Sequence, residues 1–189
     1  MANFTEAYKQ TSAHEGGYVN DTIDRGGETY RGISRIHHPS WSGWEVIGAQ
    51  KGKSNFPLLL KSDRSLQATV KKFYKQKYWD KFQGDEIADQ EIANELYDTG
   101  VNMGVRQGVR FLQNGLNLLN RDENNYQDIV IDGWFGGQTL ATLATHAGQD
   151  RSIDALLRLM NIQQGARYVT IMEADSSQER YARGWLKRT

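Results

Sequence analysis

Hydrophobic residues recur at helical spacing along most of this chain. The clearest example is a stripe of aliphatic residues in steps of four and three, formed by Val105, Val109, Leu112, Leu116 and Leu119. Similar spacing predicts helices at about residues 62–79, 89–100, 139–146 and 152–174, and a last one carrying Tyr181 and Trp185. The expected N-caps of three of them are Ser62 or Asp63, Asp89, and Ser176 with Glu179. Residues 37–61, which hold both prolines, predict a long loop with one short helix.

The chain opens with a predicted short helix. Asn3 and Glu6 have the spacing of a capping box, in which each side chain accepts a hydrogen bond from the other residue's backbone N–H. Gly16 and Gly17 are expected to end the helix, because glycine readily adopts the backbone conformation found just after one. The face that this helix buries is formed by Phe4, Ala7, Tyr8 and Thr11.

Glu15 is predicted to share that buried face. Eleven residues at about 100° each bring the side chain back to within about 20° of Phe4. Burial disfavours the carboxylate anion, so the pKa of Glu15 should rise. A general acid needs this rise, because a carboxyl of ordinary acidity has already lost its proton at neutral pH. The alternative for an isolated glutamate at a helix end is a solvated cap.

A short ribbon is predicted after the helix. Residues 18–35 place turn-forming residues, including Gly26 and Gly27, between short β-compatible pieces. A ribbon folded back beside the helix end can present Asp24 and Thr29 across a cleft from Glu15. Glycosidic cleavage requires such a pair, with an acid on the leaving oxygen and a carboxylate that orients water or stabilises the oxocarbenium ion.

Several motifs give this sequence a family resemblance. They are EGGY at 15–18, DRGGETYRGIS at 24–34, YWD at 78–80, DTGVNMG at 98–104 and RGWLKR near the end. Together they resemble glycoside hydrolase family 108, the N-acetylmuramidase family, some of whose members carry the name secretion activator. The resemblance covers nearly the whole chain and implies a lysozyme-like, mainly α fold in which Glu15 is catalytic.

The order Glu15, Asp24, Thr29 also resembles that of phage lysozymes. Those enzymes keep eight residues between the glutamate and the aspartate, as this chain does, but five rather than four between the aspartate and the threonine. By that analogy Asp24 and Thr29 hold the attacking water, and the reaction inverts the anomeric centre.

Further residues are candidates for substrate binding, each with a structural alternative. Tyr18 and Tyr30 can stack on sugar rings or pack on the helix beneath. For Trp79, the alternatives are ligand contact and packing in the core, and packing is favoured. Asn102 can bond an acetamido group or serve a cap or turn. Arg31 can meet a lactyl carboxylate or remain solvated.

The second half of the chain resembles a helical peptidoglycan-binding motif, with FLQNGLNLLN followed by IDGWFGGQT. Asp132 is expected to cap the turn, Gly133 and Gly136 to supply unusual backbone angles, and Phe135 to fill the core. These roles favour fold stabilisation over wall binding. We expect a catalytic region at 1–104 and a peptidoglycan-binding-like region at 105–189, packed as one compact unit, with Asp98 structural, as a cap or an arginine partner.

Composition excludes several other classes. The formal net charge of +0 argues against a nucleic-acid binder, and the lack of cysteine excludes disulfides and thiol catalysis. HEGGY has Tyr18 where a zinc-protease motif needs its second histidine, so no metal or cofactor is expected. No secretory signal or membrane-length apolar run is visible, so we expect a protein made in the cytoplasm that reaches the cell wall through a holin or another export route. We also expect it to be a monomer.

These features predict an N-acetylmuramidase that acts on peptidoglycan glycan strands. It would cleave the bond between N-acetylmuramic acid and N-acetylglucosamine. The alternatives are a lytic transglycosylase, a chitin-type hydrolase, and a non-catalytic wall-binding or secretion-regulating protein.

Overall fold

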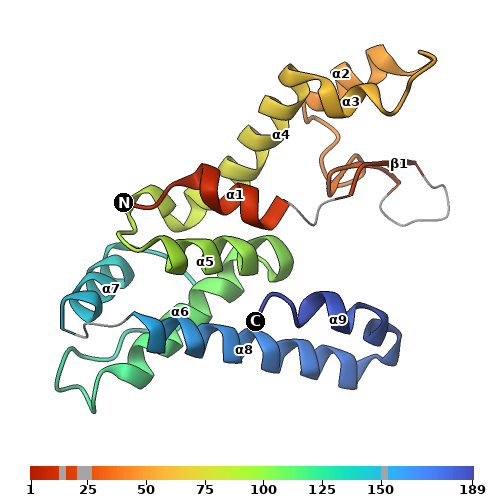
Figure 1. Ribbon diagram of the computed structural model, residues 1–189. Helices are drawn as coiled ribbons and strands as arrows, with labels where there is room; N and C mark the ends of the chain where they lie inside the picture. The colour runs from red at the N-terminus through yellow and green to blue at the C-terminus, as the bar shows by residue number, and fades with distance from the viewer. Residues whose placement is uncertain (13–15, 21–26, 150–152) are drawn as a thin grey trace. The chain divides into compact units, whose positions relative to one another are not determined.

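The computed structural model describes residues 1–12, 16–20, 27–149 and 153–189, which are mainly helical (Figure 1). One small antiparallel sheet lies near the N-terminus, so the predicted fold class is confirmed. The chain divides into two compact units, Met1–Ala7 with Tyr78–Thr189 and Tyr8–Lys77. The division between residues 104 and 105 stays a prediction.

Helix α1 (Phe4–Ser12) begins at the predicted cap. The Asn3 side-chain oxygen accepts a hydrogen bond from the backbone N–H of Thr5 at 2.7 Å. The backbone N–H of Asn3 donates to Oε1 of Gln90 at 2.7 Å, so a distant glutamine replaces Glu6 in the predicted capping box. The described helix ends at Ser12, and the predicted end at Gly16 and Gly17 stays a prediction because residues 13–15 lie outside the described residues.

The ribbon of the Tyr8–Lys77 unit is a three-stranded antiparallel sheet in the order β1-β2-β3. Tyr18 pairs with Tyr30, and Thr29 pairs with Ser34 on the other edge of β2. The predicted ribbon is thereby confirmed. The strands are β1 (Tyr18–Asn20), β2 (Glu28–Tyr30) and β3 (Ile33–Ser34).

Two short helices, rather than one, occupy the predicted loop at 37–61. Trp44, Ile47 and Leu60 are buried there, and helical backbone lets these apolar side chains reach the core. Asp63 rather than Ser62 caps the next helix, because its Oδ1 accepts from the Leu66 N–H at 2.9 Å. The helices are α2 (Gly43–Gln50), α3 (Leu59–Ser62) and α4 (Arg64–Lys77).

The other unit is built on α5 (Gln90–Met103), α6 (Val105–Leu119) and α8 (Asp154–Ala174), and α6 packs against both neighbours (Figure 1). Asp89 caps α5 as predicted, accepting from the Ile92 N–H at 3.0 Å. The helix continues three residues past Gly100, where we expected it to end, and it stops at Gly104 with φ of 90°. Near the C-terminus, Asp175 rather than Ser176 caps the last segment.

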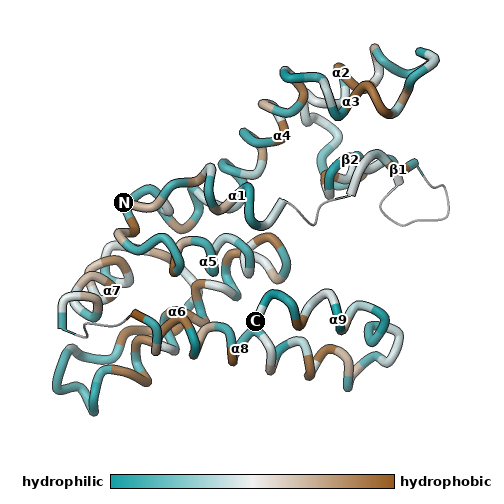
Figure 2. The backbone as a smooth tube through the Cα atoms, viewed as in Figure 1, coloured by the Kyte–Doolittle hydropathy of each residue, from teal (hydrophilic) through white to brown (hydrophobic). Residues whose placement is uncertain are grey.

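The remaining elements of this unit are α7 and several shorter segments. In Figure 2, hydrophobic and hydrophilic segments alternate along the helices, as expected when one helix face is buried. No helix of the described residues combines the length and apolar character needed to cross a membrane. The elements are η1 (Trp79–Phe82), η2 (Gly84–Glu86), α7 (Gly137–Gln149), η3 (Ser176–Tyr181) and α9 (Ala182–Trp185).

The turn before α7 matches its sequence prediction at three of four positions. Oδ1 of Asp132 accepts from the Trp134 N–H at 2.8 Å, Gly133 has φ of 78°, and Phe135 is buried. Gly136 is not among the glycines with positive φ, so the unusual angle predicted for it is wrong. Its carbonyl instead accepts from the Leu140 N–H and so opens α7.

Candidate functional site

The two carboxylates predicted to carry the chemistry, Glu15 and Asp24, lie outside the described residues. The third predicted residue, Thr29, is half-buried in β2, and its hydroxyl donates to the carbonyl of Gly27 at 3.2 Å. The structure therefore describes the residues near Glu15 in the chain and the pocket that some of them line.

A pocket of about 350 Å³ lies in the Tyr8–Lys77 unit. It joins the residues directly after Glu15 to the turn between β2 and β3 and to the start of α3. Three of the predicted substrate-binding residues, Tyr18, Tyr30 and Arg31, are brought together here. The full lining is Gly16, Gly17, Tyr18, Tyr30, Arg31, Pro57, Leu58 and Lys61.

The two tyrosines of this pocket differ in how tightly they are held. Tyr30 is 3% exposed, and its hydroxyl donates to the Leu60 carbonyl at 3.1 Å while accepting from Gln67 at 2.8 Å. Packing therefore dominates at Tyr30. Tyr18 is half-buried, and its ring lies edge-on to that of Phe56, with 4.8 Å between the ring centroids. Part of the Tyr18 ring lines the pocket.

Glu28 connects three parts of this unit. Its carboxylate accepts hydrogen bonds from Lys51 at 2.7 Å, Arg35 at 2.8 Å and the Tyr18 hydroxyl at 3.0 Å. Burial alone would raise the pKa of Glu28, but the hydrogen bonds from Lys51, Arg35 and Tyr18 outweigh it and lower the pKa. No sequence signal singled out Glu28, because its partners come from three separate segments. Glu28 fixes the sheet against the end of α2.

Trp79 and Asn102 belong to the other unit. The indole of Trp79 has no exposed surface, packs against Phe4 and Phe82, and donates to Asp85 at 2.8 Å. A ring without an exposed face cannot stack on a sugar, so Trp79 has the packing role that the sequence favoured. Asn102 is exposed, and its amide donates to the carbonyl of Asp98 at 2.7 Å, within α5.

Asp98 has the structural role that we expected. Its Oδ1 pairs with the Arg188 guanidinium at 2.5 Å and so joins the end of the chain to α5. Its Oδ2 also accepts from the Asn102 amide at 3.2 Å. The predicted arginine partner is confirmed.

Glu95 is a strongly perturbed carboxyl that was not among the residues predicted from the sequence. Burial raises its pKa to about 7, and the hydrogen bond from the Thr99 hydroxyl, at 2.8 Å, opposes the rise only in part. Thr99 in turn accepts from the Gln164 amide at 2.9 Å, which links α5 to α8. The position of Glu95 next to Leu96 on the buried side of α5 was the available signal. Its partners give it a structural role between these two helices.

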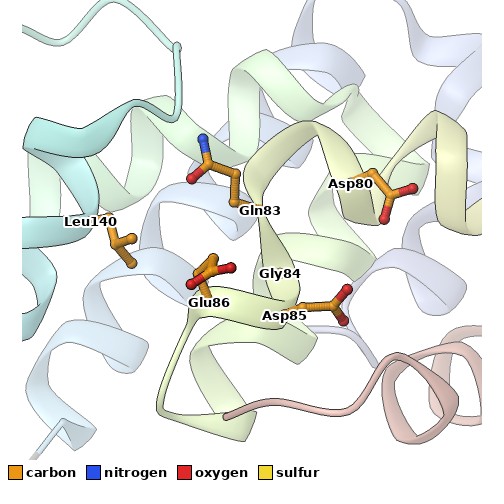
Figure 3. Close-up of a pocket in the computed structure, with 6 residues that line it drawn as sticks. All are labelled: Asp80, Gln83, Gly84, Asp85, Glu86 and Leu140. Atoms are coloured by element: carbon orange, nitrogen blue, oxygen red, sulfur yellow. The ribbon is translucent and has the colours of Figure 1, made fainter.

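A second pocket, of about 410 Å³, lies around η1 and η2 (Figure 3). Carboxylates line it, but Asp85 already accepts the Trp79 indole N–H. Gln83 donates to the Phe135 carbonyl at 3.2 Å and so connects this segment to the turn before α7. No group of three or more acidic or histidine side chains in the described part of the chain is placed to hold a metal ion. The lining is Asp80, Gln83, Gly84, Asp85, Glu86 and Leu140.

Comparison with known proteins agrees with this architecture. Residues 8–104 match the family model of glycosyl hydrolase 108, and residues 107–189 match that of a predicted peptidoglycan domain. The solved structure of Brucella abortus SagA superimposes with a TM-score of 0.58 at 22% sequence identity, covering 98% of this chain and 88% of that one. At this identity the likeness establishes the fold. No curated protein matches the sequence.

Proposed function

This chain belongs to the glycosyl hydrolase 108 family, and on that premise we propose that it is an N-acetylmuramidase that cleaves peptidoglycan between N-acetylmuramic acid and N-acetylglucosamine. The two family matches together support a role in hydrolysing or binding peptidoglycan. The observation that most directly supports the muramidase activity is the pocket whose lining starts at Gly16, directly after Glu15 in the chain.

In the proposed reaction Glu15 is the general acid. It gives its proton to the glycosidic oxygen as the bond from that oxygen to the anomeric carbon breaks. Asp24 and Thr29 hold the attacking water, and Asp24 accepts a proton from it as the new bond forms. Attack on the face opposite the leaving group inverts the anomeric centre. None of these steps requires a metal or an organic cofactor.

The pocket is the proposed binding site for the glycan beside the scissile bond. Its volume lies within the range of about 300 to 1,000 Å³ that is usual for small-ligand sites. The half-buried ring of Tyr18 is the proposed stacking surface, since an aromatic face suits the apolar side of a pyranose.

The second half of the chain is proposed to hold the enzyme at its substrate. Residues 107–189 match a predicted peptidoglycan domain, which supports the cell wall as the target of the protein. In this proposal residues 1–104 cleave the glycan and residues 105–189 add wall affinity.

The test compares the wild type with Glu15→Gln on purified cell walls. Glutamine keeps the size of the side chain but has no acidic proton to transfer, so turbidity loss should slow by at least about 100-fold. Glu6→Gln, an exposed change on the first helix, is the matched control and should keep the wild-type rate. Equal rates for wild type and Glu15→Gln would overturn the proposal.

Mass spectrometry of the released ends identifies the reaction. Reducing N-acetylmuramic acid ends are expected from hydrolysis, whereas internal anhydro ends would identify a lytic transglycosylase. Turnover of chitin without turnover of peptidoglycan would refute the muramidase assignment.

A further inference from the structure

Two basic side chains line the pocket, Arg31 from the turn between β2 and β3 and Lys61 from α3. Within the described residues neither is paired with a carboxylate, whereas Arg35 and Lys51 of the same unit both bind Glu28. A pocket with two positive charges that no carboxylate of the described residues neutralises favours an anionic ligand.

Arg31 adopts a backbone conformation that residues with long side chains rarely adopt. Its φ is 45° and that of Gly32 is 74°, the positive angles of a two-residue type I′ hairpin turn. Asparagine or glycine is the usual first residue of such a turn, because a longer side chain crowds the backbone in the left-handed region. An arginine kept at an unfavourable backbone position beside a pocket points to a use for its guanidinium.

The surrounding residues fix this arginine from both sides. The Arg31 N–H donates to the carbonyl of Gly17 at 3.2 Å, and its carbonyl accepts from the Tyr74 hydroxyl at 2.7 Å. The half-buried side chain therefore starts from a rigid point of the pocket wall. A preorganised donor loses less conformational freedom when it binds.

We propose that Arg31 and Lys61 form a subsite that binds a carboxylate carried by the muramic acid residue of the glycan. This inference rests on the proposed function and names the part of the substrate that the pocket selects. The guanidinium can bind a carboxylate through two parallel hydrogen bonds, and the Lys61 ammonium adds a second charge. Leu58, which is 79% exposed, and Pro57 offer an apolar surface to the alkyl group next to that carboxylate.

The carboxylate has two possible sources on peptidoglycan. It is the free lactyl group in glycan stripped of peptides, or it belongs to the peptide stem in intact strands. The first carboxylate is part of the sugar residue itself and the second is attached to that residue through the peptide, so ligands of each kind are needed. N-acetylglucosamine oligomers of equal length have neither group and serve as the neutral reference.

Binding is measured by calorimetry with full-length protein carrying Glu15→Gln, so that ligand is not consumed. Arg31→Asn and Lys61→Gln should each weaken the Kd for carboxylated glycan by roughly 5- to 20-fold and leave the Kd for the neutral oligomers unchanged. Raising the salt concentration should reduce the same selectivity. Lys53→Gln, an exposed change outside the pocket, should bind like the parent.

The asparagine variant separates lost binding from lost folding. Because asparagine suits the turn better than arginine, the Tm of Arg31→Asn should equal or exceed that of the parent while binding falls. A loss confined to stripped glycan assigns the lactyl carboxylate, and a loss confined to peptide-bearing strands assigns the stem. Either result supports the subsite.

Two results would overturn it: unchanged Kd values in both variants, or an equal loss on neutral and carboxylated oligomers. Neither depends on turnover. A wild type that hydrolyses peptidoglycan without this selectivity would retain the proposed function and lose the subsite. Carboxylate selectivity without hydrolysis would do the reverse.

Discussion

Ionisation of Glu95 should make the stability of this protein depend on pH near neutrality. Its pKa in the folded chain is about 7, against an ordinary value of 4.5. Because the folded value is raised, the stabilising contribution is fully present below pH 4.5 and is lost as the pH rises through about 7. At about 1.4 kcal/mol for each tenfold change in acidity, the difference amounts to about 3 kcal/mol.

Glu95→Gln removes this ionisation and keeps an oxygen that can accept the Thr99 hydrogen bond. The free energy of unfolding, measured by urea denaturation followed by circular dichroism, should fall by about 3 kcal/mol less in the variant than in the wild type between pH 4.5 and 8. Hydrogen exchange in α5 and α8 should show the same difference. Other titrating groups affect both proteins equally and cancel.

Glu91→Gln is the matched control, because Glu91 is exposed one turn earlier on the same helix. It should keep the pH dependence of the wild type. The explanation fails if Glu95→Gln also keeps that dependence. A measured pKa of 4.5 or below for the Glu95 carboxyl would refute it directly.

Further predictions concern Asp24 and Thr29, the sheet and the turn before α7. Asp24→Asn should slow wall hydrolysis by about 100-fold or more and Thr29→Ala by about 10-fold, measured as initial turbidity loss; wild-type rates would refute their roles. Glu28→Gln should lower the free energy of unfolding by about 1 kcal/mol at low salt and by less at high salt, a modest value because Arg35 and Lys51 are partly solvated. Gly133→Ala should cost about 2 kcal/mol, since φ is 78° and the added Cβ would lie 2.7 Å from a backbone oxygen, whereas Gly136→Ala, with open space, should cost less than about 0.5 kcal/mol. Equal losses in the two glycine variants would contradict this.

Much of the helical architecture follows from the sequence, because its signals act within one or two turns. The spacing of Val109, Leu112 and Leu116 predicts a buried face, and all three side chains are fully buried in α6. Asp63 and Asp89 begin helices because a carboxylate accepts an N–H three residues later, which is a local geometry. The order of helices and the short ribbon could therefore be predicted.

Predictions failed where a distant segment competes with a local one. Gln90 binds the Asn3 N–H that Glu6 was expected to take. Burial of Trp44 and Leu60 orders two helices in a stretch rich in loop-forming residues. Gly100 does not end α5, because the packing of α5 against α6 and α8 outweighs the local preference of glycine to end a helix.

For the candidate site, the sequence by itself determined which residue types are present and their order along the chain, Glu15, Asp24 and Thr29, and their catalytic roles stay a proposal. Only the tertiary structure joined Arg31 to Lys61 in one pocket, gave Glu28 its three partners and buried Glu95 between two helices. The physical reason is that charge pairing, desolvation and pocket shape depend on which segments meet in space. Sequence spacing fixes neighbours only along a single helix or strand.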